Sequence, residues 1–361
     1  MNIQPTELPK HIKETLELYE SKYDTLIYQQ DVSGASAKCV PSDGCNTCRY
    51  CEKSSPAVHF KTDCHALLEA LGNRHLFAED ECDSCNKLFG IGGGIEDHFG
   101  KWSLPYRVMS CVRGKKGYPT IKRPHLGWRI EASATGFSIS MTSDHQIASI
   151  NEEGKRLLID ELPRDPFIPI AVYKAFVRMA ISLMPRDELA NFRPAISWLM
   201  QKDHAIEIDN VCSKILQSFI PQNAPPDTVA AALARRHTNE LNLPYMVFML
   251  LFSNYIFQVF IPSPKSLQNH DFTATIFPTL YGPDPANPIT PLVVDLCGRE
   301  TVKNEMVPFP YHFGYQSVQG HHTSVHESIA TRAYYIWQAG GSILGNDESD
   351  WLLAESEITS K

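Results

Sequence analysis

The sequence has no excess of basic residues and no long uninterrupted apolar run. Its formal net charge is −8, which excludes a protein whose entire surface binds a polyanion and leaves room for a local basic patch. Its start contains no apolar segment of the kind that forms a secretory signal. Residues 243–262 have the length of a membrane span, but Ser253, Asn254 and Gln258 interrupt them. Two buried strands that turn at Ser253–Asn254 explain this stretch better, so we expect a soluble cytoplasmic protein without a membrane segment.

Disulfides are not expected inside a cell, so ten cysteines indicate metal ligands or buried thiols. Six of them lie between positions 45 and 85. Cys82 and Cys85 form one Cys-x-x-Cys pair, and Cys48 forms another with either Cys51 or Cys45. Two such pairs close a tetrahedral zinc site with Zn–S bonds of about 2.3 Å. We therefore predict a structural zinc, against the alternative of unrelated buried thiols.

Between the cysteine pairs, residues 57–65 alternate in polarity as a strand does. In that strand Cys64 faces the core, whereas Asp63 and His65 lie on the open face as an acid and a base that one site can use. The dipeptide Gly72–Asn73 predicts a turn. The residues from Cys82 onwards then predict a short helix that ends at a glycine-rich stretch.

The segments "CRYC", "DCHALLEALGN" and "ECDSCN" follow one another in this region. Over roughly residues 45–122 the chain resembles the HNH endonucleases, whose core is the ββα-metal nuclease motif, and it is most similar to their zinc-containing branch. The resemblance implies that His65 is the general base, that Asn73 orients its imidazole, and that Asn86 binds the catalytic metal ion. The expected zinc ligands are Cys48, Cys51, Cys82 and Cys85.

The sequence differs from the family pattern at a position expected to bind the catalytic metal ion. Cys64 stands where an acid commonly precedes the histidine. Asp63, one residue earlier, or Glu96 and Asp97 after the predicted short helix can supply a carboxylate instead. We expect Mg²⁺ or Mn²⁺, since Mg²⁺ prefers oxygen ligands and keeps several waters. A neutral imidazole, with a pKa near ~6.5, can deprotonate water at physiological pH, and a divalent ion can neutralise the scissile phosphate.

A block of basic residues follows the motif. From Lys101 to Arg129 the chain has eight cations and no Asp or Glu. Three of the cations lie in the glycine-flanked loop "RGKKGYP", with Tyr118 near enough to stack. In an acidic protein such a block favours contacts with the phosphates of DNA, or of RNA, over an ordinary solvated face. The residues expected to make these contacts are Arg113, Lys115, Lys116, Lys122 and Arg123.

The remaining two thirds of the chain predict an α+β domain without a nucleotide-binding loop, a nucleophile constellation or a second metal cluster. Sensor, target-recognition and dimerisation roles therefore stay open. Helical spacing and alternation predict the following elements: helices at 169–185 and 186–200 with a break near Pro194, a short helix or a loop at 227–237, and strands at 127–141, 245–261 and 291–296.

The two ends of the chain predict helices. Residues 7–28 form an N-terminal helix with no evident chemistry. Near the other end, "RAYYIW" and "DWLLAESE" resemble a short bacterial domain of unknown function. That domain is a helical hairpin, in which we expect Tyr334, Trp337 and Trp351 to be buried.

These features predict an α+β protein in four segments: an N-terminal helical segment (1–34), a zinc-containing HNH nuclease module (35–126), an α+β domain (127–310) and a helical C-terminal domain (325–361). The resemblance implies a bacterial, metal-dependent endonuclease that hydrolyses phosphodiester bonds of DNA. Family habit alone suggests a role in defence against foreign DNA. The alternative is a zinc-dependent nucleic-acid-binding protein that has lost catalysis. Homo-oligomer formation and any activating ligand stay open.

Overall fold

A computed structural model describes most of the chain. The described residues are 10–31, 36–40, 44, 46–142, 147–151, 153, 155–208, 213–220, 228–237, 239–266, 291–315, 325–339 and 347–359. They divide into two compact units. The first comprises 1–121, 130–139 and 162–307, and the second comprises 122–129, 140–161 and 308–361. Each unit is described by itself.

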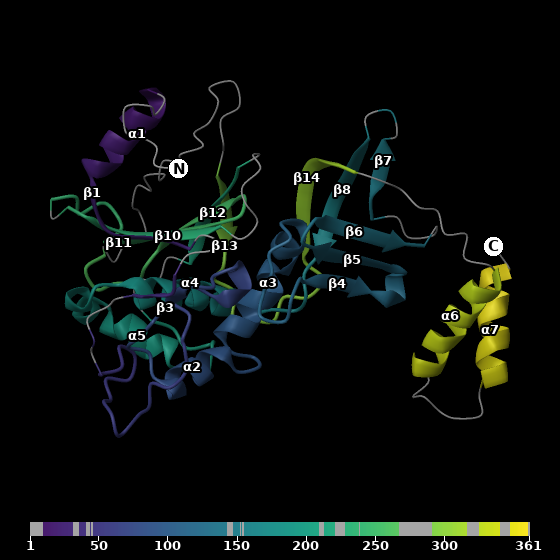
Figure 1. Ribbon diagram of the computed structural model, residues 1–361, viewed down its shortest axis with the longest axis horizontal. Coiled ribbons are helices and arrows are strands. Elements are labelled where there is room, and N and C mark those ends of the chain that lie inside the picture. Colours follow the sequence, from purple (N-terminus) through teal and green to yellow (C-terminus); the bar gives the residue numbers. More distant parts are fainter. Residues whose placement is uncertain are drawn as a thin grey trace. The chain divides into compact units, whose positions relative to one another are not determined.

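A six-stranded sheet of order β1–β10–β11–β12–β9–β13 forms the frame of the first unit (Figure 1). Every neighbouring pair in it is antiparallel. Strands β10, β11 and β12 are buried along almost their whole length, which places them in the core. The strands are β1 (Tyr23–Asp31), β9 (Lys214–Phe219), β10 (Val229–Arg236), β11 (Met246–Phe252), β12 (Tyr255–Phe260) and β13 (Leu292–Asp295).

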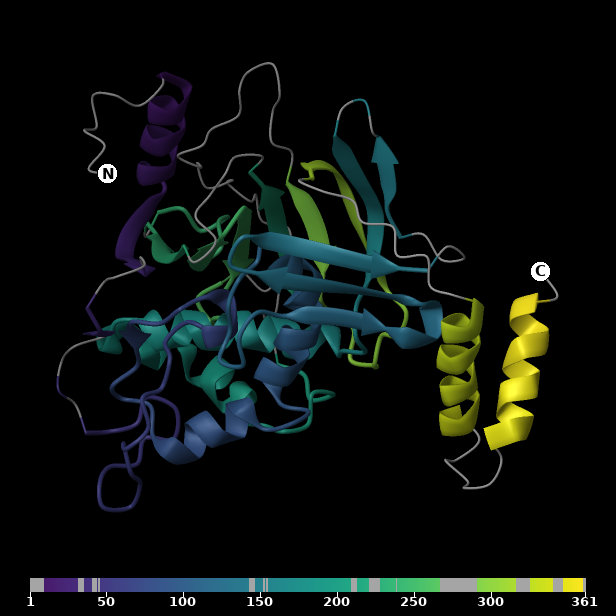
Figure 2. The same cartoon turned by 45° about the vertical axis from the view of Figure 1, so that its right-hand side comes forward.

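Helix α4 (Pro169–Leu183) runs along one face of this sheet, and every one of its residues is buried. Its sequence is apolar all round, so it needs covering on both sides. The sheet covers one side, where Phe176 packs on Phe257 with ring centroids 5.4 Å apart. Helices α2 (Asp83–Gly90) and α5 (Arg193–Leu199) lie on the other side (Figure 2).

The region of the cysteine pairs has little regular structure before α2. Strands β2 (Lys38–Cys39) and β3 (Leu76–Phe77) pair in parallel. A 3-10 helix, Glu69–Leu71, lies between them in sequence. After α2 comes α3 (Ile95–Met109), which the sequence reading did not anticipate.

Two smaller sheets and a helical pair complete the described elements, together with α1 (Lys10–Glu20). The sheets have the orders β4–β5–β6 and β14–β8–β7. In the second unit, the helical hairpin predicted at the C-terminus is present. The elements are β4 (Thr120–Arg123), β5 (Trp128–Ser133), β6 (Gly136–Met141), β7 (Ser149–Asn151), β8 (Arg156–Pro163), β14 (Met306–Gly314), 3-10 helices at Pro124–Leu126 and Arg186–Phe192, α6 (Val325–Ala339) and α7 (Asp347–Thr359).

Most predicted elements form, and the membrane-length stretch is a strand hairpin. Val247 pairs with Phe260 and Phe252 with Tyr255 across the turn at Ser253–Asn254. No helix in the described part of the chain is long and apolar enough to cross a membrane. The helix at 169–185, the restart near Pro194 and the strands at 127–141 and 291–296 are confirmed.

Two predictions of helix are wrong. Residues 227–237 supply β10, although alanine is the best helix former. Here β10 is hydrogen-bonded to β1 on one side and to β11 on the other, so sheet pairing overrides local propensity. The N-terminal helix ends at Glu20, and residues 23–28 belong to β1 for the same reason.

The compact units do not follow the predicted segments. The sequence assigned α4 to a domain separate from the cysteine pairs, yet both belong to the first unit. The physical reason is that α4 lacks a polar face, so one sheet alone cannot bury it.

Candidate metal centre and nuclease motif

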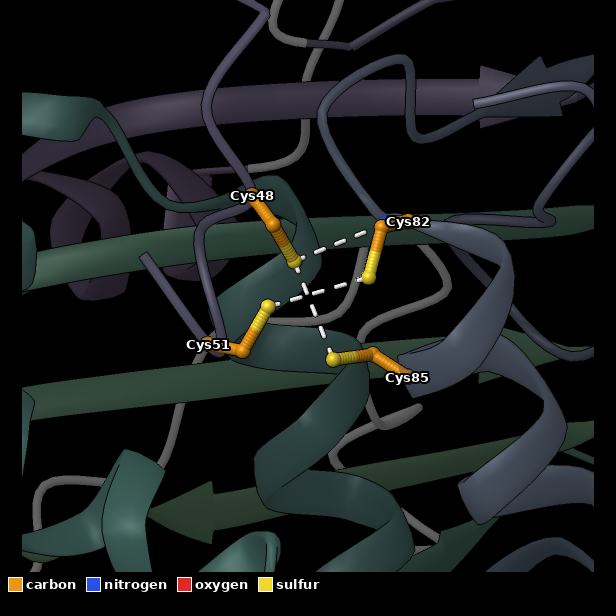
Figure 3. A group of neighbouring side chains, drawn as sticks. All are labelled: Cys48, Cys51, Cys82 and Cys85. Carbon is orange, nitrogen blue, oxygen red and sulfur yellow. Dashed lines mark hydrogen bonds between the residues drawn. The ribbon is translucent and has the colours of Figure 1, made fainter. Parts of the chain in front are cut away.

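Four cysteine thiols converge at one point in the first unit (Figure 3). The sulfur atoms of Cys48 and Cys85 lie 3.8 Å apart, and those of Cys51 and Cys82 lie 3.7 Å apart. In a regular tetrahedron with metal–sulfur bonds of about 2.3 Å, ligand atoms are about 3.8 Å apart. The four thiols can therefore hold a metal ion, and their geometry fits zinc. Cys45, the other possible partner of Cys48, lies outside the described residues.

Local backbone structure presents each thiol pair. A turn at the first pair is closed by the N–H of Glu52, which donates to the Cys48 carbonyl at 2.9 Å. Cys82 is the N-cap residue immediately before α2, and its carbonyl accepts from the N–H of Cys85 at 3.0 Å. Hydrogen bonding with the Cys85 thiol lowers the pKa of Cys48 to about 5, and backbone N–H groups add to this. A thiolate is the form that binds metal.

A buried arginine attaches the first pair to α4. Arg49, 1% exposed, forms a two-point ion pair with Asp80, at 2.6 Å from Nε and 2.9 Å from Nη2. Its Nη1 donates to the carbonyls of Ile181 and Met184 at the C-terminal end of α4. The Ile181 carbonyl also accepts the N–H of Met184 at 3.2 Å. Carbonyls at a helix C-terminus carry partial negative charge, so a guanidinium there is favourable.

The segment before α2 forms a minimal antiparallel pair rather than the predicted strand. No strand forms over residues 57–64; only His65 bridges to Phe77. The Ala66 N–H donates to the Leu76 carbonyl at 3.0 Å, and the N–H of Ala78 donates back to the Cys64 carbonyl. The expected strand fails because Asp83 Oδ1 accepts the N–H groups of residues 61 and 62 at 3.0 and 2.9 Å. Those donors are then lost to a strand ladder.

Asn73 ties the turn of this pair. Its side chain is fully buried, and Nδ2 donates to the carbonyls of Leu67 and Leu76 at 2.6 and 2.9 Å. Its Oδ1 accepts the N–H of Leu76 at 2.9 Å. The sequence predicts that Asn73 orients the imidazole of His65, but the hydrogen bonds of its amide go to backbone groups of Leu67 and Leu76. Asn73 instead holds His65 indirectly, by fixing the turn.

A second buried arginine fixes the backbone at His65. Arg178, 1% exposed in the middle of α4, pairs with the fully buried Glu81 at 2.8 Å. Its Nη1 donates to the His65 carbonyl at 2.7 Å. The buried ion-pair residues Arg178, Arg49 and Glu81 were not predicted from the sequence. The available signal was a cation within an otherwise apolar helix, which requires a buried partner.

The His65 imidazole is half-buried and packs against Phe77, with ring centroids 4.9 Å apart. Burial lowers its pKa, and Glu69 partly opposes this. Three cations lower the pKa further: Arg178, Arg74 and Lys115. A neutral imidazole can accept a proton from water.

The residues predicted to bind the catalytic ion are not gathered into one cluster. Asn86 is half-buried in the first turn of α2, and its side-chain amide makes no hydrogen bond to the described residues. Asp63 is exposed. Burial raises the pKa of Cys39, and the negative charges of Glu79 and Asp63 raise it further. Glu96 lies 3.9 Å from Arg178. Among the described residues, only the four cysteines form a group of three or more His, Cys, Asp or Glu side chains close enough for an ion.

The basic residues predicted to contact nucleic acid lie at the surface of their own units. In the first unit, Arg113, Lys115 and Lys116 are exposed on the loop after α3. In the second unit, Lys122 is exposed and Arg123 is partly exposed on β4.

The C-terminal hairpin differs from expectation in one aromatic residue. Tyr334 is 54% exposed, whereas Trp337 and Trp351 are half-buried. The buried contact instead involves small and aliphatic residues, such as Ala354 at 0% exposure. Arg332 and Glu357 join the helices through an ion pair at 2.5 Å.

The comparisons with known proteins bear on this hairpin alone. Residues 324–360 match a family described as "Protein of unknown function (DUF2934)". No curated protein and no solved structure matches the chain.

Proposed function

We propose that the chain is an HNH-type endonuclease that hydrolyses phosphodiester bonds of DNA. The observation that carries the proposal is the order of parts between the thiol pairs. A short antiparallel pair begins at His65, its turn is tied by Asn73, and a helix follows with Asn86 in its first turn. This order supports the proposal, because the ββα-metal motif to which the sequence is similar arranges a strand, a turn, a second strand and a helix in the same sequence.

In this proposal the four cysteines hold a structural zinc. Sulfur atoms 3.7–3.8 Å apart between the two Cys-x-x-Cys turns suit zinc. Three of the four thiols are buried, which suits a site without an open coordination position. The zinc then fixes the start of α2, at Cys82, to the turn at Cys48. Asn86 takes its position from the same turn of helix, because its N–H bonds to the Cys82 carbonyl at 3.0 Å.

The chemical step assigned to this chain is proton removal from water by His65. The imidazole is half-buried and its lowered pKa favours the neutral form, which is the form that accepts a proton. Arg178 and Asn73 position it through the backbone. A catalytic Mg²⁺ or Mn²⁺ would neutralise the scissile phosphate, with Asn86 and either Asp63 or Glu96 as candidate ligands.

A second candidate function is a zinc-dependent nucleic-acid-binding protein without catalysis. Two observations favour it. Cys64 is a buried thiol whose S–H donates to the Glu81 carbonyl at 3.5 Å, so it offers no oxygen ligand beside His65. Asp63 interacts with Cys39, as described above.

Plasmid cleavage with Mg²⁺ or Mn²⁺ tests the two candidates, comparing wild type with His65→Ala at matched zinc content. His59→Ala is the matched control, because His59 is exposed in the same segment. We expect metal-dependent nicking by wild type and control, and none by His65→Ala. Binding without cleavage by all three proteins would favour the second candidate. Equal cleavage by all three would refute His65 as the base.

From the family resemblance alone we also propose a role in defence against foreign DNA. Expression of the wild type in a bacterial host should lower the plating efficiency of some phages, and His65→Ala should not. Equal plating with both proteins across a phage panel would remove this role.

A further inference from the structure

A cavity of about 420 Å³ lies in the first unit, between α3 and the loop that follows it. Four cations line it: Lys101 and Arg107 from α3, and Lys115 and Lys116 from the loop. Both loop lysines are exposed, so the cavity reaches the surface. Tyr118 and Ala70 also line the cavity.

Arg107 is the unusual member of this lining. Its Nη1 donates to the Gly100 carbonyl at 3.3 Å, but its Nε is buried and has no hydrogen-bond partner. Within the described residues it forms no ion pair with a carboxylate. Burial alone lowers its pKa to about 10, without an acidic neighbour to oppose the shift. Because buried charges normally have partners, this guanidinium has the environment of an anion-binding group.

The acids in the cavity wall have other cations. Asp97 accepts from Lys101 Nζ at 2.8 Å and from the Gly93 N–H at 3.0 Å. Glu96 faces Arg178, as described above. Asp165 also lines the cavity. None of these described carboxylates therefore forms an ion pair with Arg107.

The loop holds its lysines at the mouth of the cavity by backbone structure. Gly114 and Gly117 exchange hydrogen bonds at 2.9 and 3.0 Å, which makes a tight turn with Lys115 and Lys116 at its tip. Gly117 has φ +97°, which only glycine adopts readily. Arg74 also holds the loop, because its Nη2 donates to the Gly114 carbonyl at 3.3 Å.

The cavity lies beside the proposed base. Ala70, in its wall, belongs to the 3-10 helix that starts four residues after His65. Lys115, at its mouth, is close enough to His65 to lower the imidazole pKa.

We propose that this cavity binds one phosphate of the DNA backbone, with the half-buried Arg107 as its anchor and Lys115 and Lys116 at its mouth. The inference rests on the proposed function, because it places the strand beside His65. A guanidinium suits this role, since its planar donors match two phosphate oxygens at once.

The test is the affinity for a labelled 16-base-pair duplex without added Mg²⁺ or Mn²⁺, measured by fluorescence anisotropy over a range of salt concentrations. Arg107→Met removes the charge and keeps the length of the side chain. Arg299→Met is the matched control, because Arg299 is an exposed arginine that pairs with Glu207 and does not line the cavity. We expect Arg107→Met to weaken binding at least about tenfold. It should also reduce the slope of log K against log salt by about one, which corresponds to one lost phosphate contact.

A folding defect is separable from a binding defect. Loss of an unpaired buried charge should leave the melting temperature of Arg107→Met unchanged or higher. Should the variant misfold, Arg107→Lys and the double variant Lys115→Met/Lys116→Met test the same cavity. Affinity and slope equal to those of Arg299→Met would overturn the proposal.

Two further outcomes separate the sources of phosphate and the two proposals. In one outcome, adenosine monophosphate raises the melting temperature of wild type but not of Arg107→Met, and the two proteins bind the duplex with equal affinity. The cavity then takes a free nucleotide, and the backbone assignment falls. Binding that depends on Arg107 without any cleavage by wild type would support the cavity and count against the nuclease. Cleavage that depends on His65 and is unchanged in Arg107→Met would support the nuclease and count against the cavity as a phosphate site.

Discussion

The ion pair between Arg178 and Glu81 gives the sharpest prediction about stability. Both side chains are almost completely buried, at 1% and 0% exposure, and 2.8 Å separates Nη2 from Oε2. Arg178→Met leaves the Glu81 carboxylate buried without its partner and removes the hydrogen bond to the His65 carbonyl. Breaking a buried pair in this way costs about 3–5 kcal/mol. Replacing both partners by apolar groups of similar volume is often close to neutral, so Arg178→Met/Glu81→Met should recover most of the loss.

The assay is urea unfolding at fixed zinc concentration, followed by fluorescence or circular dichroism. The control is Arg299→Met, an exposed arginine paired with Glu207, whose removal should change the free energy of unfolding by less than about 1 kcal/mol. The reasoning is refuted if Arg178→Met is as stable as the control. It is also refuted if the double variant is no more stable than the single one. The double variant should still cleave DNA less well than wild type, because nothing replaces the donor to His65.

Two further predictions concern the metal centre and the turn. Cys48→Ser should lose the bound zinc and unfold in less urea, whereas Cys64→Ser, at a buried thiol outside the cluster, should keep one zinc per chain, as measured by elemental analysis. Equal zinc content in both variants would contradict the assignment of ligands. Asn73→Ala should lower the free energy of unfolding by about 2–3 kcal/mol, because it removes the hydrogen bonds that the amide makes to the Leu67 carbonyl and to the N–H of Leu76. A loss below about 1 kcal/mol in urea unfolding would show that water replaces the amide.

Local patterns predicted the elements that local forces decide. The helix at 169–185 has an apolar run with proline at its first position and proline after its end. The hairpin at 245–261 has two apolar strands and a Ser–Asn turn. The patterns failed where a distant partner decides the outcome. Val229–Arg236 form a strand because β1 and β11 lie on either side. Residues 57–64 form no strand because the carboxylate of Asp83 accepts the N–H groups of residues 61 and 62.

The sequence alone determined the candidate zinc ligands, because a Cys-x-x-Cys turn brings two thiols together within a few residues of chain. It also limited the cysteine register to two choices, and the family resemblance singled out His65 among the three histidines between the pairs. Only the tertiary structure decided which groups surround it. Arg178 reaches the His65 carbonyl from more than a hundred positions away, and Arg107 lines a cavity while forming no ion pair with a carboxylate of the described residues. Whether a buried charge is compensated depends on the fold, since its partners come from segments that the sequence does not place together.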